Sequence, residues 1–568
     1  MGSRTGTPGP LGEWGQDRAR SQQGVPFLQY EPRPVSLVQL LNESHRWDHR
    51  THLVCGAERI GFAGLRRQVA AAARVLGELG VGRGDQVAIL GWNSTGWVIS
   101  FWASTVLGAV PVFANAWWSR AELDAALRVC DPVLVLSDDA HRDLPGPGYR
   151  VRNMRELTRD PAAGDSAGQP GLLPVPAGAN EGDPAAIIFT SGSTGAAKGA
   201  VLSHRSIIAQ LHSVLAMARK RPSELPADAE PEVTLVTGPL FHVGALQTLV
   251  RSVVVGGELV FLDGRFDPAA VVKAIESERI TRWGGVPTMV SRVLAYLRTS
   301  AHDVSSLRAL TFGGSAVAVP LLERTREAFP NAHSGVSQLY GMTEAGGSLT
   351  FASGRSTLAH PDAVGRALPL VELRISAPDE EGVGEILART PTQMSGYWGT
   401  AESPIAADGW LQTGDLGRID EDGFLYVVGR SKDVIIRGGE NIAAGHVESA
   451  LLAHPEVVEA GVVGVPDPDL GERVGAVVCL RPGADVSPDE LRGFLRGALS
   501  YFEIPELLRC GTSPLPTTGS NKIDKAGLRV LLSEPSPPLL APSPPLLAPA
   551  PPPGRSAAGP GGSPAGPC

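Results

Sequence analysis

The stretch FTSGSTGAAKG, residues 189–199, decides how the fold of this chain is interpreted. The apolar run AAIIF before it and the run AVLSH after it each predict a short strand. Gly192 and Gly195 let backbone N–H groups converge on an anion because no Cβ blocks the approach, and Lys198 adds a positive charge. The remaining donors are the hydroxyls of Thr190, Ser191, Ser193 and Thr194. Together these residues predict a phosphate-binding loop between two strands at a sheet edge.

A simpler interpretation of this loop is a flexible hairpin with a solvated lysine, since Gly/Ser-rich segments are common. The loop also differs from the common nucleotide P-loop, which has glycine directly before its lysine where this chain has Ala197. The chain has 50 lysines and arginines, of which only six are lysines. A lysine retained against that bias favours a site that needs a compact ammonium, although a GC-rich genome produces the same bias.

The composition excludes several classes of protein. A length of 568 residues predicts two or more domains, and a hydrophobic content of 43% is ordinary for a globular chain. The net charge of −9 gives no reason to expect a nucleic-acid partner. The five cysteines are scattered without a C-x-x-C pair, which disfavours disulfide frameworks and zinc sites and fits a reducing, cytoplasmic location.

One segment, GWVISFWASTVLGAVPVFANAWW at residues 96–118, imitates a membrane span because it is uncharged and long enough to cross a bilayer. Serine, threonine, glycine, proline and asparagine residues interrupt it. Gly108 followed by AVPVFA favours a buried helix that turns into a buried strand. We therefore expect no membrane span.

The pattern along the chain predicts four parts. Residues 1–30 form a flexible leader. Residues 31–430 alternate helices and strands, which predicts layered α/β structure, and residues 431–533 form a smaller α+β unit. Residues 534–568 contain SPPLLAP twice and consist mostly of proline, glycine and alanine, so we expect a disordered tail.

Four further segments carry side chains suited to a nucleotide. In QLYGMTE, residues 338–344, Tyr340 can stack on a purine, Thr343 can donate to a phosphate and Glu344 can hold Mg²⁺. TFGGSA, residues 311–316, offers a flat glycine floor. Asp415 in LQTGDLGRIDEDGFLYVVGR can accept from two ribose hydroxyls, and Lys522 in PTTGSNKIDK lies on a glycine turn. Taken singly, these residues are equally well a core aromatic, a turn aspartate or a surface charge.

In this order, FTSGSTGAAKG, YGMTE, TGDLGRIDEDGFLYVVGRSKDVIIRGGENI and NKID resemble the motifs of the acyl-adenylate-forming superfamily, over residues 35–530. That superfamily includes acyl-CoA synthetases, luciferases and peptide-synthetase adenylation domains. The resemblance implies an α/β fold, with a large N-terminal domain of layered α/β subdomains plus a distorted β-barrel and a small mobile α+β C-terminal domain. It also implies ATP, Mg²⁺ and CoA as cofactor and co-substrates.

The resemblance assigns roles position by position. The implied ATP-binding residues are Thr190, Ser191, Gly192, Ser193, Thr194, Gly195, Lys198, Gly314, Ser315, Tyr340, Gly341, Thr343, Asp415, Arg430 and Lys522. The implied catalytic residues are Lys198, Thr343, Glu344 and Lys522, with Glu344 as the metal ligand. Lys522 is expected to reach both the substrate carboxylate and the α-phosphate, and Lys432 is expected to be the hinge of the small domain.

The acid substrate is implied by a second group of residues. His242 in PLFHVGALQ occupies the position where amino-acid-activating domains have an aspartate, which favours the fatty-acyl and aryl branch. The implied acid-binding residues are His242, Val243, Gly244, Gly313, Gly314 and Gly341. Gly438 and Gly439 resemble the loop that frames the pantetheine tunnel, and no carrier domain follows residue 530, so CoA is the expected acceptor. We expect a fatty acid as the substrate.

Three alternatives and three departures accompany this interpretation. The enzyme can instead load an acyl-carrier protein, activate an aryl acid, or have lost activity and act as a scaffold that docks partners through its proline tail. The family's usual glycines are replaced by Asn521 before the catalytic lysine and by Leu339 before Tyr340. The usual aromatic-proline pair and glutamate after GGENI are replaced by Ala443, Ala444 and His446. Asparagine tolerates positive φ, so we expect the lysine turn to persist.

Overall fold

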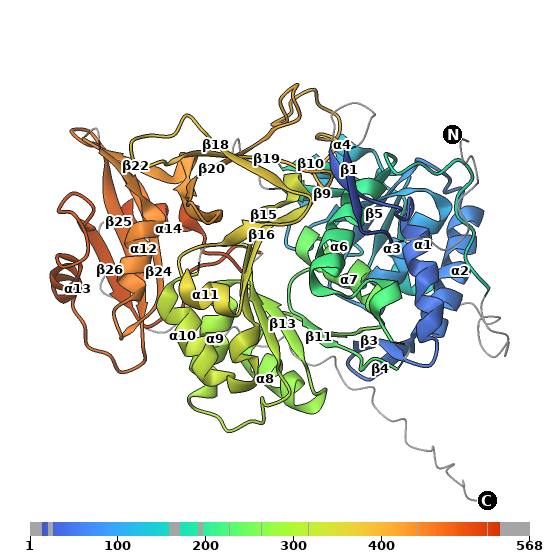
Figure 1. The fold of residues 1–568 in the computed structure, drawn as a ribbon, viewed down its shortest axis with the longest axis horizontal. Helices are drawn as coiled ribbons and strands as arrows, with labels where there is room; N and C mark the ends of the chain where they lie inside the picture. The colour runs from blue at the N-terminus through green and yellow to red at the C-terminus, as the bar shows by residue number, and fades with distance from the viewer. Residues whose placement is uncertain are drawn as a thin grey trace, which may run out of the picture.

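The computed structural model describes residues 14–20, 27–157, 171–190, 197–226, 228–262, 264–315, 317–438, 440–519 and 521–533. The tail and most of the expected leader lie outside these ranges. In the described part, two large sheets and their helices form the main body, and a smaller sheet forms a separate unit at one end (Figure 1). A two-stranded ribbon, β1 (Asp17–Arg20) with β2 (Leu28–Glu31), lies at the N-terminal side.

A six-stranded sheet carries the phosphate-loop hairpin at its edge. Its order is β10 (Lys198–Ser203), β9 (Pro184–Thr190), β6 (Val110–Ala114), β5 (Gln86–Leu90), β7 (Leu134–Ser137) and β8 (Val151–Asn153). All neighbouring pairs are parallel except β10 with β9. The segment that imitates a membrane span is the buried helix α3 (Thr95–Leu107), a left-handed cap at Gly108 with φ of 72°, and the buried strand β6, as predicted.

A thirteen-stranded sheet carries most of the remaining site residues. Its order is β18 (Glu372–Ser376), β19 (Gly384–Arg389), β20 (Leu411–Ile419), β21 (Phe424–Arg430), β17 (Gly365–Ala367), β16 (Gly347–Ser353), β15 (Val336–Met342), β14 (Ala309–Phe312), β13 (Arg282–Gly285), β11 (Val233–Val236), β12 (Glu258–Phe261), β3 (Thr51–Cys55) and β4 (Glu58–Gly61). Strands from β3 to β15 pair in parallel, and those from β15 to β18 pair antiparallel. The antiparallel part extends toward the small unit in Figure 1.

Helices fill the space between the two large sheets and cover their outer faces. One core joins strands of both sheets with α1 (Leu37–Glu43), α2 (Phe62–Glu78), α3, α6 (His204–Ala218) and α7 (Val243–Val255). A second core packs α8 (Pro268–Ser277), α9 (Pro287–Leu297) and α10 (Val319–Ala328) on the other face of the larger sheet. The helix α4 (Arg120–Cys130) covers the other face of the six-stranded sheet. Two short helices, α5 (Met154–Leu157) and α11 (Arg355–Ala359), complete the main body.

The C-terminal unit is a five-stranded sheet with helices on both faces. Its strands are β23 (Glu440–Ala443), β22 (Val434–Arg437), β25 (Gly471–Leu480), β24 (Val457–Asp467) and, paired to β25, β26 (Leu507–Gly511). One face packs on α12 (Ala444–Leu452) and α13 (Pro488–Leu495), and the other packs on α14 (Lys525–Ser533). The predicted α/β class with a small α+β C-terminal unit is confirmed.

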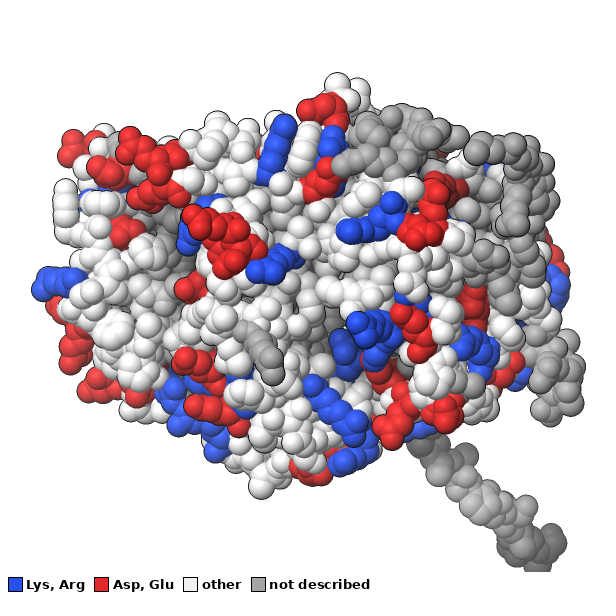
Figure 2. Space-filling model, viewed as in Figure 1, with Lys and Arg blue, Asp and Glu red and all other residues white. Residues whose placement is uncertain are grey.

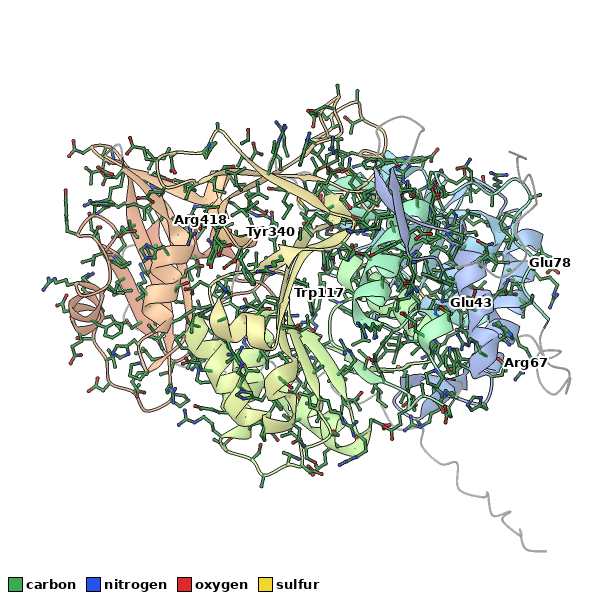
Figure 3. All side chains as sticks on the ribbon, in the orientation of Figure 1. Glu43, Arg67, Glu78, Trp117, Tyr340 and Arg418 are labelled. Atoms are coloured by element: carbon green, nitrogen blue, oxygen red, sulfur yellow. The ribbon has the colours of Figure 1, made fainter. Side chains whose placement is uncertain are left out.

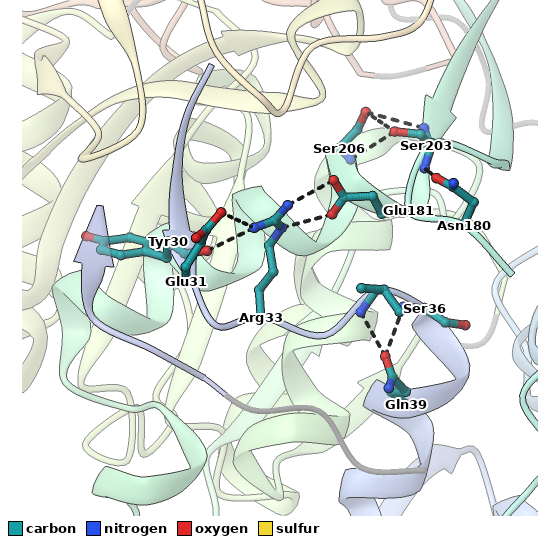
Figure 4. A network of polar contacts seen from close by, with 11 residues as sticks. Tyr30, Glu31, Arg33, Ser36, Gln39, Asn180, Glu181, Ser203 and Ser206 are labelled. Carbon is teal, nitrogen blue, oxygen red and sulfur yellow. Dashed lines mark hydrogen bonds and ion pairs between the residues drawn. The ribbon is translucent and has the colours of Figure 1, made fainter. Parts of the chain in front are cut away.

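Polar contacts tie the N-terminal ribbon to the strand that enters the phosphate loop (Figure 4). The Arg33 guanidinium donates to both carboxylate oxygens of Glu181 at 2.8 and 2.9 Å. Glu181 lies three residues before β9, so this bidentate pair anchors the start of that strand. After β10, Ser203 caps α6 and forms a reciprocal capping box with Ser206. The two strands that flank the phosphate loop are therefore fixed at their far ends.

Charged side chains of both signs are interspersed over the face shown in Figure 2. Within the described ranges, no helix combines the length and the apolar character needed to cross a bilayer.

Candidate functional site

The described ends of the phosphate loop are the adjoining strand ends of the β9–β10 hairpin. Thr190 pairs with Lys198 in the register, and the Thr190 hydroxyl donates to the Lys198 carbonyl at 3.5 Å. The Lys198 ammonium contacts the carboxylate of Glu402 and lies 5.4 Å from the centre of the Tyr397 ring. Five predicted phosphate-binding residues lie outside the described residues: Ser191, Gly192, Ser193, Thr194 and Gly195. The predicted strand–loop–strand arrangement is thus confirmed up to both ends of the loop.

Glu344, the predicted metal ligand, and Lys198 are both neighbours of Tyr397. Its Oε1 atom accepts a hydrogen bond from the Tyr397 hydroxyl at 3.0 Å, and the residue is only 8% exposed. Burial and the neighbouring Glu344 raise the pKa of Tyr397, so this phenol remains a donor. Thr343 precedes Glu344 in a one-turn 3-10 helix and is partly exposed. Tyr397 was not predicted, because only the tertiary pairing of residue 397 with Ala200 brings it here.

The donor set around Glu344 is compatible with Mg²⁺ held jointly by protein and phosphate. Mg²⁺ retains several waters and binds one or two carboxylates together with phosphate oxygens. Among the described residues, there is no group of three or more His, Cys, Asp and Glu side chains that forms a metal cage. The buried Glu344 carboxylate has its Oε1 committed to Tyr397, and no contact of the described residues occupies Oε2.

A second group, here called the ribose clamp, consists of Tyr340, Asp415 and Arg430. The Tyr340 hydroxyl donates to Asp415 Oδ2 at 2.7 Å, and Arg430 Nε lies 3.1 Å from Asp415 Oδ1. Asp415 and Arg430 are directly opposite each other on β20 and β21. Burial, followed by the negative charge of Asp415, raises the pKa of Tyr340, so the phenol stays protonated. The carboxylate is therefore held in one orientation, with its remaining lone pairs available to hydroxyl donors.

Lys522 projects from a short turn of the small unit into the main body. The Thr518 N–H donates to the Lys522 carbonyl at 2.7 Å, and the Asn521 N–H donates to the Thr518 carbonyl at 2.9 Å. Asn521 has φ of 59°, so the left-handed position usually filled by glycine is filled by asparagine, as expected. The Thr288 hydroxyl on α9 contacts the carbonyl of Asn521. The predicted lysine turn is thus formed despite the departure from the family pattern.

The tip of Lys522 lies beside the glycine floor. A Cβ on Gly314 would be 3.2 Å from Lys522 Cε and 3.3 Å from Val286 Cγ1, and Gly314 has φ of +82°. Glycine at this position therefore makes room for the lysine and permits the backbone conformation. Burial, followed by the positive charge of Arg430, lowers the pKa of Lys522, while Asp415 opposes this shift.

His242 is the predicted acid-binding residue that interacts electrostatically with Lys522. It caps the N-terminus of α7, and its Nε2 atom is buried without a hydrogen-bond partner among the described residues. Burial and the charge of Lys522 lower the pKa of His242 to about 4, so the imidazole is neutral near pH 7. A neutral imidazole with an unpaired buried nitrogen, next to a buried ammonium, is arranged to accommodate a carboxylate.

The predicted acid-binding glycines differ in what surrounds them. A Cβ on Gly313 would lie 2.9 Å from Leu339 Cδ1, so Leu339 packs directly against the floor. A Cβ on Gly341 would lie 2.0 Å from the Gly347 carbonyl, which makes this strand position obligatory for glycine. Gly244, which follows Val243 in the first turn of α7, has open space in front of it. Ser315 is exposed next to Gly314.

The predicted hinge and CoA residues lie where the main body meets the small unit. Lys432 is exposed in the 3-10 turn Ser431–Asp433, directly after Arg430, and no ion pair of the described residues includes it. Gly438 has φ of +59°, and its N–H donates to the Leu470 carbonyl at 2.8 Å. Gly439 lies outside the described residues. The structure therefore brings Lys522 beside Gly314, within electrostatic reach of His242, Asp415 and Arg430, while Lys432 follows this group along the chain.

Figure 3 shows where these groups lie in the molecule. Tyr340 is on the side of the main body that faces the small unit, and Trp117 lies near the centre, toward the six-stranded sheet. The site therefore occupies the region where the two large sheets and the small unit approach one another.

The chain is similar to known enzymes in both sequence and structure. The family model for AMP-binding enzyme matches residues 41–398, and the model for the AMP-binding enzyme C-terminal domain matches residues 446–522. A feruloyl-CoA synthase from an Amycolatopsis species is 35% identical over 488 residues, which cover 85% of this chain and 96% of that protein. A 2-succinylbenzoate–CoA ligase from Bacillus cereus is 31% identical over 495 residues, with the same coverage of 85% and 96%.

A solved structure with the same fold is o-succinylbenzoate coenzyme A synthetase from Bacillus subtilis in complex with ATP and a magnesium ion. The TM-score is 0.70 at 29% identity, over 87% of this chain and 99% of the other.

Proposed function

The chain belongs to the AMP-binding enzyme family as an AMP-forming acid–CoA ligase, and we propose that it activates a hydrophobic carboxylic acid at the site around Lys522. The observation that carries this proposal is the buried Lys522 ammonium, which lies beside Gly314 and interacts electrostatically with His242 and with Asp415 and Arg430 of the ribose clamp. Such an arrangement allows one ammonium to serve both a carboxylic acid and a nucleotide.

In the first half-reaction, a carboxylate oxygen of the acid attacks the α-phosphorus of ATP, and the bond to the β-phosphate breaks. The products are acyl-AMP and pyrophosphate. Both reactants are anions, so the Lys522 ammonium lowers the repulsion between them and stabilises the charge that develops on the α-phosphate. Asp415 accepts from the ribose hydroxyls, Arg430 keeps Asp415 oriented, and Tyr340 offers its ring to the adenine.

The β- and γ-phosphates are held by the loop of residues 190–195 and by Lys198 in this proposal. Lys198 must exchange Glu402 for phosphate oxygens when ATP binds. Glu344 would hold Mg²⁺, which neutralises phosphate charge when bound. Thr343 donates to the α-phosphate.

In the second half-reaction, the sulfur of CoA attacks the acyl carbon, the thiol proton is lost and AMP leaves. One face of the acyl-AMP cannot hold both Lys522 and an incoming thiol, so the small domain has to move. We place the domain boundary between residues 430 and 431, with the hinge at Lys432, and assign Gly438 and Gly439 to the CoA approach. The division into residues 1–30, 31–430, 431–533 and 534–568 stays a prediction, as does a cytoplasmic location.

The acid itself has two candidates. The sequence predicts a fatty acid, although His242, in place of the aspartate of amino-acid-activating domains, favours the fatty-acyl and aryl branch as a whole. An aryl acid is the second candidate, because several similar proteins are named for aromatic acids, among them feruloyl-CoA synthase and 2-succinylbenzoate–CoA ligase. The open space at Gly244 and the flat floor at Gly313 and Gly314 suit either class.

The proposal is tested with a panel of fatty and aromatic acids, by measuring pyrophosphate release and then acyl-CoA formation. Release with an acid from either class, followed by CoA-dependent release of AMP, supports a CoA ligase of that specificity. Adenylation with transfer only to a carrier protein supports the carrier-loading alternative. No release with any acid would leave a protein without ligase activity.

Two lysine variants separate the half-reactions. Lys522→Ala should reduce acyl-AMP formation by about 100-fold or more, because one charge-stabilising donor is lost from the transition state. It should leave thioester formation from supplied acyl-AMP nearly unchanged. Lys432→Pro should show the reverse pattern, because proline fixes φ near −65° and restricts the hinge. If Lys522→Ala forms acyl-AMP at the normal rate, the assignment of the site is wrong.

A further inference from the structure

The catalytic-lysine turn rests on a tryptophan of the main body. A Cβ built on Gly519 would lie 2.5 Å from Trp117 Cγ, 2.6 Å from Cδ1 and 2.8 Å from Cβ. These separations are far inside van der Waals contact, so only a residue without a side chain fits between the turn and the indole. Gly519 does not have a positive φ, so its backbone conformation is open to other residues. The close approach of Trp117 therefore explains why glycine is needed at position 519.

Trp117 is held from two other sides. The Trp92 ring packs edge-on against it at 4.7 Å between centroids, and the Arg265 guanidinium lies 4.8 Å from its ring centre. Its indole nitrogen is buried and has no hydrogen-bond partner among the described residues. The ring is therefore positioned by packing, and its contribution to the contact with Gly519 is its shape.

The support behind Trp117 is a hydrogen-bonded group. His141 bonds to Asp138 Oδ1 at 2.6 Å through Nδ1 and to the Ala116 carbonyl at 3.0 Å through Nε2. The backbone N–H of Trp92 donates to Asp138 Oδ2 at 2.9 Å. Asp138 and His141 thus fix both Trp92 and the peptide that precedes Trp117, so the ring presents a rigid surface to the turn.

Further contacts of the small unit with the main body come from α9. The Ser291 hydroxyl donates to the Val458 carbonyl at 3.2 Å, and Arg292 Nε lies 2.8 Å from Glu459 Oε1. These contacts hold β24 and do not touch Gly519. The Ser291 contact provides an internal comparison, because it holds β24, whereas Arg292 also donates to the carbonyl of Leu515, four residues before Gly519, at 3.3 Å.

We propose that Trp117 is a positioning residue for Lys522: it sets how far the turn at Gly519 enters the main body and so places the ammonium beside Gly314. The inference rests on the proposed role of Lys522 in forming acyl-AMP. Lys522 follows Gly519 by three residues in a turn closed by backbone hydrogen bonds, so a displacement at Gly519 is transmitted to the lysine. A misplacement of about 1 Å in a reacting group can cost about 100-fold in rate.

This role predicts a loss that is confined to one half-reaction. Lys522 has to leave the site before CoA enters, so the contact between Gly519 and Trp117 is broken during thioester formation. Gly519→Ala should lower the rate of acyl-AMP formation by about 10- to 100-fold, with KM for ATP within about 2-fold, because the ribose clamp is not disturbed. Thioester formation from supplied acyl-AMP should be retained.

The decisive experiment is a double-mutant cycle with Trp117→Gly, which removes the three atoms nearest to the new Cβ. Trp117→Gly should itself slow acyl-AMP formation, because the turn loses the ring against which it packs. Adding Gly519→Ala to Trp117→Gly should cause no further loss, because the clash no longer exists. Adding Gly519→Ala to Ser291→Ala should multiply the losses of the two single variants, because the Ser291 hydroxyl donates to the Val458 carbonyl of β24 and not to the turn.

Two controls keep the result interpretable. Gly493→Ala, also in the small unit, meets nothing within 4 Å and should leave both half-reactions unchanged. Trp117→Phe retains a planar ring and should keep most of the rate of acyl-AMP formation. If Trp117→Gly does not fold, Trp117→Phe replaces it. In that case Gly519→Ala should still lower the rate when it is combined with Trp117→Phe.

The inference is overturned if Gly519→Ala retains the normal rate of acyl-AMP formation, if it slows both half-reactions equally, or if its loss multiplies with that of Trp117→Gly. Failure of the proposed function looks different, since Lys522→Ala would then form acyl-AMP normally. Loss of acyl-AMP formation in Lys522→Ala, combined with multiplicative losses at Gly519 and Trp117, would remove only the positioning role.

Discussion

The two ends of the nucleotide site are built in different ways. At the ribose end, Tyr340 and Arg430 hold Asp415, whose side chain is 6% exposed. At the phosphate end, Lys198 pairs with Glu402, whose side chain is 70% exposed. The first group is closed around a buried acceptor, and the second is an ion pair open to water.

The difference follows from the cost of leaving each group without a partner. A buried carboxylate without donors loses hydration, so its partners have to be present before the nucleotide arrives. An exposed ion pair is stabilised little, typically by about 0–1 kcal/mol, and exchanges easily for phosphate. If the proposed roles hold, the ribose end is preorganised, and Lys198 at the phosphate end exchanges its partner when ATP binds.

The largest effect is expected from Asp415→Ala. It leaves the Tyr340 hydroxyl without its partner and frees Arg430, which costs roughly 1–3 kcal/mol for the orphaned buried donor in addition to the lost ribose contact. We expect kcat/KM for ATP to fall by about 100-fold or more and the melting temperature to fall as well. Steady-state kinetics with varied ATP and thermal unfolding measure the two effects.

Glu372→Ala is the matched control for Asp415→Ala. It removes a carboxylate from another cross-strand pair of the same sheet, with Arg389 at 2.9 Å. If Glu372→Ala changed kcat/KM for ATP as much as Asp415→Ala does, the proposed role of the ribose clamp in binding ATP would be contradicted.

An intermediate effect is expected at His242, which extends the comparison to pH. The pKa of His242 is about 4 in the folded chain and about 6.5 when unfolded. Below pH 6.5 the unfolded chain takes up a proton that the folded chain does not, so stability falls as the pH drops toward 4. His242→Gln removes this contribution, so the stability difference between wild type and variant should shift by about 2 kcal/mol in favour of the variant between pH 7 and pH 5.

Denaturant unfolding at the two pH values tests this prediction. The wild type should still lose stability for other reasons, because burial also lowers the pKa of His52, His204 and His212 to about 4. An identical pH dependence in wild type and His242→Gln would contradict the prediction, because it would mean that His242 has the same pKa in the folded and in the unfolded chain.

The smallest effect is expected from Glu402→Gln at the phosphate end. The variant removes the competitor for Lys198, and an exposed ion pair contributes little to stability. KM for ATP should fall by no more than about 5-fold, and the melting temperature should stay the same. The difference should shrink in high salt, which screens the pair in the wild type. A loss of activity comparable to that of Asp415→Ala would break the contrast between the two ends.

Much of the site could be predicted because its residues lie in short, ordered segments. The β9–β10 hairpin, the buried helix and strand at residues 95–114, and the lysine turn all depend on local signals such as apolar runs, glycine and Asn521. The residues that were missed share no such signal. Tyr397 lies in a loop 53 residues after Glu344, its hydrogen-bond partner, and Trp117 lies about 400 residues before Gly519.

The sequence by itself determined the α/β class, the small C-terminal unit and the residue types that a nucleotide and an acid require. It could do so because glycine, lysine and the hydrophobic periodicity act over a few neighbouring residues. Only the tertiary structure decided that Tyr340 is bonded to Asp415, that Lys198 is paired with Glu402, and that Trp117 excludes a side chain at position 519. These contacts join segments that are distant along the chain, and their energies depend on burial and distance, which exist only after the chain has folded.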